Sequence, residues 1–412
     1  MKNYPDWRFN FSDDWQEKKL RNVCHYVDYR GKTPQKVDNG IFLVTAKNIR
    51  MGYIDYDCSK EFVKQDEYDE IMHRGYPKIG DVLITTEAPC GNIAVIDRDD
   101  IALAQRVIKY SSKNKNNLNN KYLSYELMSP TFQKILSSKA TGGTSQGIKG
   151  EVLHELKIKI PCIEEQKKIS DYLTHFDKAL TAQEKKVTNW REVKKGMLQK
   201  IFSREFRFKD DNGNDYPDWQ DKKLGDLISI PISNGVFCDP KKKGTGKKII
   251  NVINLYNDFV IDEDSLELLN IDEKEFKANQ VHQGDLFFTR SSLKLEGIAH
   301  CNIYFGNDKN VTFDGHIMRV RLNNDLANSK FIMLQSMTSK IRSQMMMKAK
   351  TTTMTTIGQE ELADVKYKIP CIEEQKKIAD YFSHLDKIIS AESKILESMR
   401  EMKKGLLRKL FV

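Results

Sequence analysis

The segments 161–202 and 370–411 carry the most regular pattern of apolar positions in the chain. In both, apolar residues recur at alternating spacings of three and four, the heptad pattern of a coiled-coil helix. In the first segment these residues are Ile169, Leu173, Phe176, Leu180, Val187, Trp190, Met197 and Ile201. In the second they are Ile378, Phe382, Leu385, Ile389, Leu396, Met399, Leu406 and Leu410. The pattern predicts two long helices, because proline stands only at their starts and glycine only near their ends.

The two segments also repeat one another without a gap, and more than half of their positions are identical. Each places a polar residue at the same position of the apolar stripe, Gln183 in the first copy and Glu392 in the second. Such a residue commonly fixes the register of a helix pair. A single apolar stripe needs a second one to cover it, so we expect the two copies to form an antiparallel coiled coil with a pseudo-twofold axis. The alternative is that each helix packs only on its own globular domain.

The sequence before each long segment predicts a mixed α/β (α+β) globular domain. Short buried strands are expected at 41–45, 81–86, 93–97 and 156–160, and at 249–253, 285–289, 298–305 and 317–322. Helical patterns occupy 121–138 and 328–348. Weaker echoes connect the two halves, including WQEKKL with WQDKKL, YPDW with YPDW, and a Gly-Asp pair at 80–81 and 284–285. We therefore expect globular domains at 1–160 and 206–369, each followed by a long helical segment, 161–205 and 370–412.

Composition adds a weak preference for an acidic partner. The chain has 67 Lys and Arg against 58 Asp and Glu, a formal charge of +9, which suits nucleic acid but also many solvated surfaces. Its 7 cysteines are scattered without a C-x-x-C pair. Because neither a secretory signal nor a long apolar run is present, we expect a soluble, cytoplasmic protein without a membrane partner.

The sequence contains no recognisable catalytic motif. The sequence lacks the glycine-rich cofactor loop and the Asn/Asp-Pro-Pro-aromatic loop of an adenine methyltransferase. Gly31-Lys32-Thr33 resembles the end of a phosphate-binding loop, but Tyr26 stands where the earlier glycine is required. The 8 histidines form no metal-binding spacing. We therefore predict no catalytic residue, no metal site and no cofactor on this chain.

Several loops combine glycine, hydroxyl, amide and basic residues, a mixture suited to phosphates and base edges. In the first half the candidate DNA-binding residues are Arg30, Lys32, Thr33, Lys47, Asn48, Arg50, Gln105, Arg106, Thr144, Ser145, Gln146 and Lys149. In the second half they are Asn234, Lys242, Asn254, Arg290, Ser291, Lys350 and Thr353. Any one of these loops can also be an ordinary solvated turn. Their recurrence in both halves favours the functional interpretation.

The PCIEEQKKI segments at 161 and 370, the GKTP at 31–34, the Gly-Asp pairs and the TGGTSQGIK loop at 141–149 together resemble the specificity subunit of type I restriction-modification systems. The resemblance covers the whole chain, although the second half lacks GKTP and has a threonine-rich loop at 351–356. It implies two target recognition domains that read a split, double-stranded DNA site. It also implies helices that dock two methyltransferase (modification) subunits, through which restriction subunits join, and a role in host defence. A free-standing two-domain DNA-binding protein and an enzyme with unrecognised catalytic residues remain the alternatives.

Overall fold

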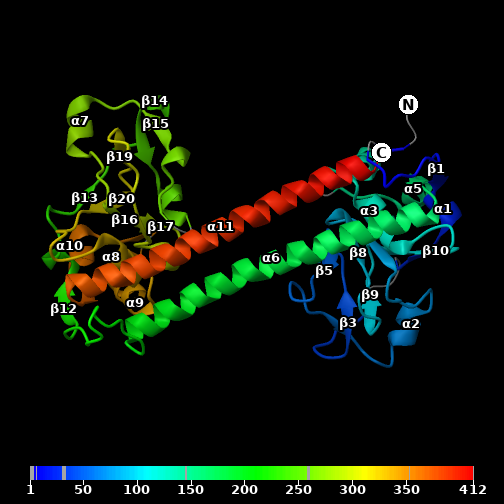
Figure 1. Cartoon of the computed structure of the whole chain (residues 1–412), viewed down its shortest axis with the longest axis horizontal. Helices are drawn as coiled ribbons and strands as arrows, with labels where there is room; N and C mark the ends of the chain where they lie inside the picture. The colour runs from blue at the N-terminus through cyan, green and yellow to red at the C-terminus, as the bar shows by residue number, and fades with distance from the viewer. Residues whose placement is uncertain are drawn as a thin grey trace. The chain divides into compact units, whose positions relative to one another are not determined.

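The computed structural model describes residues 4–5, 7–29, 34–143, 146–257, 260–351 and 353–411. By their internal contacts the residues form two compact units. Unit 1 comprises Met1–Glu184 and Lys394–Val412, and unit 2 comprises Lys185–Ser393 (Figure 1). Each unit therefore contains one globular part and about half of each long helix. Within the described ranges, no helix combines the length and apolar character needed to cross a membrane.

Unit 1 is built around a four-stranded antiparallel sheet in the order β2-β10-β7-β8. Its strands are β1 (Gln16–Lys19), β2 (Cys24–Asp28), β3 (Ile41–Val44), β4 (Ile49–Arg50), β5 (Tyr53–Ile54), β6 (Phe62–Val63), β7 (Val82–Thr86), β8 (Cys90–Val95), β9 (Ile101–Leu103), β10 (Val107–Ser112) and β11 (Lys157–Ile160). Its helices are α1 (Leu20–Val23), α2 (Tyr68–Met72), α3 (Asn120–Met128), α4 (Pro130–Lys139), α5 (Gly150–Glu155) and the first part of α6 (Ile163–Ser203). A smaller sheet, β6-β3-β9, adds a second core. Every residue of β7 is buried, as its unbroken apolar start predicts.

Unit 2 repeats this plan with the sheet β13-β20-β16-β18. Its strands are β12 (Gln220–Lys223), β13 (Ser233–Asn234), β14 (Lys243–Ile250), β15 (Glu267–Leu269), β16 (Leu286–Thr289), β17 (Ser291–Ser292), β18 (Cys301–Ile303), β19 (Val311–Phe313), β20 (Ile317–Val320), β21 (Lys350–Thr351), β22 (Thr355–Thr356) and β23 (Lys366–Ile369). Its helices are α7 (Glu273–Ala278), α8 (Ser329–Ser336), α9 (Ser339–Lys348), α10 (Gln359–Ala363) and the first part of α11 (Ile372–Leu410). The smaller sheet is β15-β14-β19, in which β14 and β19 run parallel, as β3 and β9 do in unit 1. The predicted α/β class, present twice and followed each time by a long helix, is confirmed.

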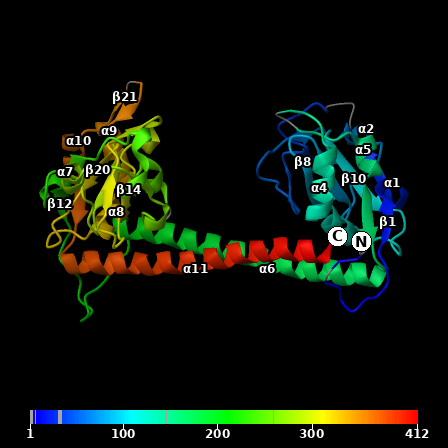
Figure 2. The same ribbon diagram turned by 90° about the horizontal axis from the view of Figure 1, so that it is seen from above.

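The long helices pair antiparallel within each unit, and in Figures 1 and 2 α6 (green) and α11 (orange to red) lie side by side. In unit 1, Asp177 near the start of α6 pairs with Lys403 near the end of α11 at 2.7 Å. In unit 2 the repeat-equivalent residues, Asp386 and Lys194, pair at 2.5 Å. The predicted stripe residues in the described helices are buried or half-buried. Antiparallel pairing is therefore confirmed in both units.

The alternative, in which each helix packs only on its own globular domain, is wrong, but the helices do also pack on these domains. Ile169 and Leu173 of α6 belong to the same buried cluster as Tyr122 and Leu123 of α3. The end of α11 joins that cluster through Leu410. The start of each long helix thus lies on its own globular core as well as against the other helix.

The repeated Glu-Glu-Gln motif anchors each long helix to that core. Glu165 accepts hydrogen bonds from Arg8 at 2.6 Å and from the indole of Trp15 at 3.2 Å. Glu374 accepts the same pair of bonds from Arg207 at 2.8 Å and Trp219 at 3.0 Å. The WQEKKL and WQDKKL echo therefore marks equivalent residues, Trp15 and Trp219. The YPDW echo does not, because Trp7 is exposed and packs on Tyr172.

The Gly-Asp pairs also have a structural role. Gly80 and Gly284 have φ angles of 89° and 90°, in the left-handed region that glycine tolerates best. Asp81 forms an ion pair with the buried Lys109 at 2.8 Å, and Asp285 accepts two hydrogen bonds from Arg321, each of 2.7 Å. These ion pairs fix the start of the central strand in each unit, which is β7 in unit 1 and β16 in unit 2. They lie at the opposite end of that strand from the loop that follows it.

Candidate nucleic-acid interface

Three loops meet at the end of the central strand in unit 1. They are the loop after β7 (86–90), the turn before β10 (104–107) and the segment 141–149. The backbone N–H of Thr86 donates to the carbonyl of Arg106 at 2.9 Å, and the N–H of Ile148 donates to the carbonyl of Thr86 at 2.9 Å. An isolated bridge also joins Glu87 to Gly147. The backbone of one residue, Thr86, thus holds the other two loops in place.

The same three loops meet in unit 2, where they are 290–298, 314–316 and 350–357. Arg290 N–H donates to the carbonyl of His316 at 2.9 Å, and Ile357 N–H donates to the carbonyl of Arg290 at 3.1 Å. In addition β17 pairs with β22, and β22 pairs with β21. Figure 2 shows β21 on the side of unit 2 away from α11. We call this arrangement, in either unit, the three-loop site.

In unit 1 the three-loop site brings together four of the predicted DNA-binding residues. Arg106 has a φ of 70°, and its half-exposed side chain pairs with Glu87 at 3.3 Å. Gln105 beside it is half-buried, while Gln146 and Lys149 are exposed. The predicted residues Arg30, Lys32, Thr33, Thr144 and Ser145 lie outside the described residues.

Lys47 and Arg50 lie on a turn next to this site. Both are exposed, and Arg50 pairs with Asp55 at 3.4 Å. The turn is attached to β8, because the side chain of Asn92 donates to the carbonyl of Ile49 at 2.8 Å. These two cations therefore flank the loops without belonging to them.

Asn48 and Asn254, both predicted to bind DNA, have a structural role in the fold. Asn48 is fully buried, and its amide oxygen accepts the N–H of Thr45 at 3.0 Å while its NH₂ group donates to the carbonyl of Ser59 at 2.8 Å. Asn254 is also buried, and its oxygen accepts the N–H of Asn251 at 2.8 Å. Both side-chain amides form hydrogen bonds with backbone groups of a turn. These bonds satisfy backbone groups that would otherwise be unpaired. The sequence similarity between the halves at Asn48 and Asn254 is therefore explained by this shared role in the fold.

In unit 2 the site brings together Arg290, Ser291, Lys350 and Thr353. Arg290, Lys350 and Thr353 are exposed, and Ser291 is half-buried. Lys350 pairs with Glu361 at 3.3 Å. The pKa of Glu361 is lowered, first by backbone hydrogen bonding and then by Lys350, so this carboxylate partly neutralises the lysine.

Asn234 and Lys242 are not on the three loops of unit 2, although Asn234 lies two residues before Val236, whose carbonyl accepts the N–H of Gly315 at 2.8 Å. Asn234 is half-buried in β13, paired with Met318 of β20, and within the described part of the chain its buried side-chain oxygen has no hydrogen-bond partner. Lys242 is exposed, and its carbonyl accepts the N–H of Asn270 beside the smaller sheet. The structure does not bring these two residues into the three-loop site.

The prediction missed His316, which is exposed where unit 1 has Arg106. The detectable signal was the echo of Gln105-Arg106-Val107 in Gly315-His316-Ile317, just before two equivalent strands. It also missed the apolar side chains of the same site. A hollow of about 670 Å³ is lined there by Val252, Tyr256, Ser291, Ser292, Leu293, Lys294, Glu296, Gly297, His316 and Met354.

A stacked pair of rings lies beneath this hollow. Tyr256 stacks on His300 with their centroids 4.5 Å apart. Burial lowers the pKa of His300, although its hydrogen bond with the carbonyl of Leu255 opposes the shift. The stack is therefore neutral at pH 7, so the cations of the site come from the loops above it.

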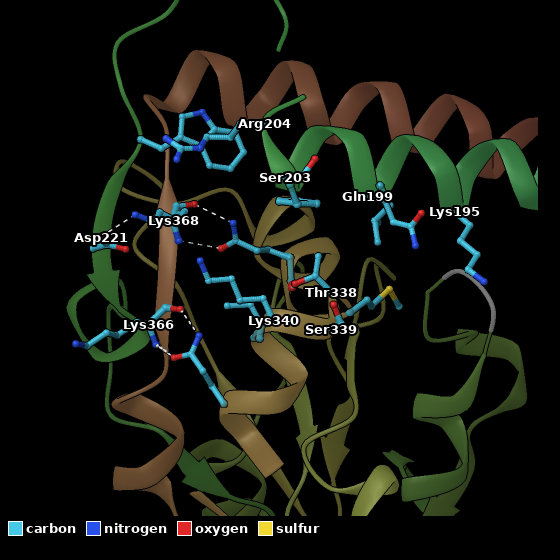
Figure 3. A pocket seen from close by; sticks show the side chains of 17 residues that line it. Lys195, Gln199, Ser203, Arg204, Asp221, Thr338, Ser339, Lys340, Lys366 and Lys368 are labelled. Atoms are coloured by element: carbon cyan, nitrogen blue, oxygen red, sulfur yellow. Dashed lines mark hydrogen bonds and ion pairs between the residues drawn. The ribbon is translucent and has the colours of Figure 1, made fainter. Parts of the chain in front are cut away.

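A second hollow in unit 2, of about 730 Å³, lies at the end of α6 and has a different character (Figure 3). Lys195 and Arg204 reach it from α6 and the residue that follows, and Lys340 from the start of α9. Lys366 and Lys368 line it from β23, where Lys368 pairs with Asp221 at 2.9 Å. This basic hollow contains none of the predicted DNA-binding residues and shares no residue with the three-loop site.

Across the described ranges, no three His, Cys, Asp or Glu side chains are placed to hold a metal ion. The arrangement instead offers exposed hydrogen-bond donors on rigidly joined loops. Such groups suit the recognition of phosphates and base edges.

Comparison with known proteins agrees with this chemistry. Residues 12–189 and 216–400 each match the family described as type I restriction modification DNA specificity domain. The chain is 21% identical over 407 residues to the Type I restriction enzyme MjaVIII specificity subunit of Methanocaldococcus jannaschii, covering 97% of this chain and 92% of the relative. It is 23% identical over 309 residues to the EcoKI specificity subunit of Escherichia coli strain K12, covering 70% of this chain and 64% of the relative.

Solved structures show the same fold. The S subunit of a type I restriction-modification system from M. genitalium matches with a TM-score of 0.59 and 15% identity, over 99% of both chains. A chain from a study of complex assembly and conformational transition of the type I R-M system matches with the same TM-score and identity, over 98% of this chain and 99% of that one.

Proposed function

Because the chain belongs to the family of type I restriction modification DNA specificity domains, we propose that each of its two units reads one half of a two-part DNA sequence through its three-loop site. The observation that carries this proposal is the recurrence of one backbone frame with different side chains. Arg106 stands in unit 1 where His316 stands in unit 2, and Glu87 where Ser291 stands. Equal frames with unequal side chains suit two different half-sites.

The side chains divide by their expected targets. Arg106 and Arg290 are exposed on the turns nearest the strand end, and arginine binds the O6 and N7 acceptors of guanine with two donors. Lys149 and Lys350 are exposed on the third loop, and lysine binds phosphates without reading sequence. The loop residues Arg30, Lys32, Thr33, Thr144 and Ser145, which lie outside the described residues, remain proposed contacts of unit 1.

We further propose that the paired helices dock two modification subunits, through which restriction subunits join the complex. Support comes from an equivalent pair of apolar residues outside the buried stripe. Val193 on α6 is 44% exposed, and Met402, its repeat equivalent on α11, is 56% exposed. One such residue falls in each unit, which suits one partner subunit for each unit.

The alternatives predict different behaviour. A free-standing DNA-binding protein needs no partner for its task, and an enzyme shows turnover with Mg²⁺ or S-adenosylmethionine alone. Relatives whose names describe specificity subunits favour the partner-dependent function over both.

The test is to express the chain with the methyltransferase subunit of its own system and to sequence the methylated adenines. We expect a two-part motif with an unread spacer. Arg106→Ala should relax one half of that motif, and Arg290→Ala the other half. A motif without two separable halves, or relaxation of both halves by either variant, would contradict the proposal.

A further inference from the structure

The three-loop site of unit 2 contains a longer loop than that of unit 1. In both units a threonine hydroxyl at the end of the central strand accepts a backbone N–H from the returning strand. Thr85 and Asn92 make this bond across 7 residues, whereas Thr289 and His300 make it across 11. The added length lies in the loop that carries Leu293 and Lys294.

The longer loop presents an apolar side chain at an unusually exposed place. Leu293 is 85% exposed, and the hollow beside it also takes in Met354, which is 39% exposed, and Tyr256, which is 48% exposed. Exposed apolar groups that gather on one surface commonly mark a binding site. Among the described residues of the three loops of unit 1, no large apolar side chain is exposed, although Met51 and Tyr53 are exposed on the neighbouring turn.

Basic side chains lie at and near this apolar hollow, whose lining also includes one carboxylate, Glu296. Lys294 lines it, and Arg290 is exposed on the same loop. Lys350 lies on β21, which is joined through β22 to β17. An apolar surface with basic side chains beside it is complementary to a polyanion such as DNA, which presents apolar groups between its charged phosphates.

We propose that the hollow formed by Leu293, Met354 and Tyr256 recognises the 5-methyl group of thymine in the half-site read by unit 2. Among the base-edge groups of the major groove, the thymine methyl is the apolar one, and apolar side chains are its natural contacts. The inference rests on the proposed function of the three-loop site. It adds that unit 2 selects thymine at one or more positions by apolar contact, in contrast to unit 1.

The experiment uses the full chain in complex with its methyltransferase subunit and duplexes that contain the identified motif. Each thymine of the motif is replaced in turn by deoxyuridine, which removes only the methyl group. Because burial of one methyl group contributes about 0.8 kcal/mol, we expect about fourfold weaker binding at a recognised thymine. In Leu293→Ala the difference between thymine and uracil at that position should vanish.

Leu295→Ala is the matched control, since Leu295 is exposed on the same loop but does not line the hollow. It should keep the preference for thymine. Equal binding of thymine and uracil at every position of the unit 2 half-site would overturn the inference. So would a preference for thymine that survives Leu293→Ala.

Two other roles of Leu293 give different results, and each would also overturn the inference. A wedge between base pairs predicts that Leu293→Ala weakens thymine and uracil duplexes equally and reduces DNA bending. A protein contact predicts normal DNA binding but loss of complex assembly. Failure of the proposed function is distinguishable from all of these, because the wild-type complex would then show no preference for any sequence in this half of the motif.

Discussion

Glu126 in unit 1 and Gln335 in unit 2 accept the same hydrogen bond at equivalent places in the two repeats. Glu126 accepts the backbone N–H of Lys159 at 3.1 Å, and Gln335 accepts that of Lys368 at 3.2 Å. The two side chains differ in their other terminal group, which is a second oxygen in Glu126 and an NH₂ group in Gln335. The NH₂ group of Gln335 donates to the carbonyl of Lys368 at 2.9 Å, whereas the second oxygen of Glu126 is buried and has no hydrogen-bond partner among the described residues.

Burial raises the pKa of Glu126 to about 8 from an ordinary value of 4.5. A carboxyl group whose folded-state pKa is raised stabilises the fold fully below its unfolded-state pKa and loses that contribution as pH rises through the folded-state pKa. We therefore expect the free energy of unfolding of unit 1 to fall between about pH 5 and pH 8. Glu126→Gln should remove this fall and raise the stability at pH 8 by on the order of 2 kcal/mol. Thermal unfolding at pH 5, 7 and 8 measures both effects.

Gln335→Glu provides the reciprocal control. It places a carboxyl group in the equivalent buried position of unit 2, where Phe331 stands in place of the tyrosine found in unit 1. The variant should lose stability progressively above pH 5. Equal pH profiles for the wild type and Glu126→Gln would show that Glu126 is ionised in the folded protein.

The ion pairs between the long helices should contribute unequally to the free energy of unfolding. Asp386 binds both Lys194 and Lys330, and Lys330 is buried. Asp386→Ala leaves the Lys330 ammonium group buried without its carboxylate, which should cost about 3–5 kcal/mol. Its repeat equivalent, Asp177→Ala, should cost about 1 kcal/mol, because Asp177 and its partner Lys403 are more exposed. Chemical denaturation of both variants measures the difference.

The effect of Asp386→Ala should also depend on pH. Burial already lowers the pKa of Lys330, and the attraction of Asp386 opposes that shift. Without Asp386 the folded-state pKa falls further below the unfolded-state value, so the unfolded chain binds more protons. Stability should then rise as pH increases from 7 towards 10. A loss that is equal at pH 7 and pH 10 would rule out a charged Lys330 as the cause.

Local patterns predicted the long helices and central strands but not the places where helices break. The observed α6 and α11 begin two residues after the prolines at 161 and 370. The single helix predicted at 121–138 is two helices, because the Ser129 hydroxyl caps a new start at Pro130. The helix predicted at 328–348 breaks at the same place without a proline, and Thr338 stands at the N-cap without a side-chain cap bond.

Individual residues of the candidate site could be predicted from the sequence, but their grouping in space could not. Arg106, Lys149 and Arg290 have the residue types of a DNA contact and are exposed. Their grouping depends on backbone bonds such as that between Ile148 and Thr86, which are distant in sequence. The structural role of Asn48 was not predictable, because sequence does not distinguish an amide that holds a turn from one that is exposed on a loop.

Arg106 and Lys149 should differ in what their loss does to DNA binding. Arg106→Ala should weaken binding to the cognate half-site by about 1–3 kcal/mol and relax its sequence. Lys149→Ala should weaken binding to all sequences alike and reduce the slope of log affinity against log salt by about 1. Binding assays at several salt concentrations, with cognate and altered duplexes, separate the two effects. A Lys149→Ala variant with altered sequence preference would assign that lysine to base reading.

The first half of the chain, from Met1 to Arg204, should dimerise and read a palindrome. Removal of α11 exposes the apolar stripe of α6, and a second copy of α6 can cover it because the two helices share that stripe. In such a dimer Lys194 of one copy can meet Asp177 of the other, since Lys194 is the repeat equivalent of Lys403, with which Asp177 now pairs at 2.7 Å. A symmetric pair presents two copies of the unit 1 site, so the methylated motif should contain its half-site twice in inverted orientation. Asp177→Lys should dissociate the fragment dimer, and adding Lys194→Asp should restore it, as measured by analytical ultracentrifugation. A fragment that remains monomeric at micromolar concentration, or that directs methylation to an asymmetric motif, would refute this exchange of one helix for the other.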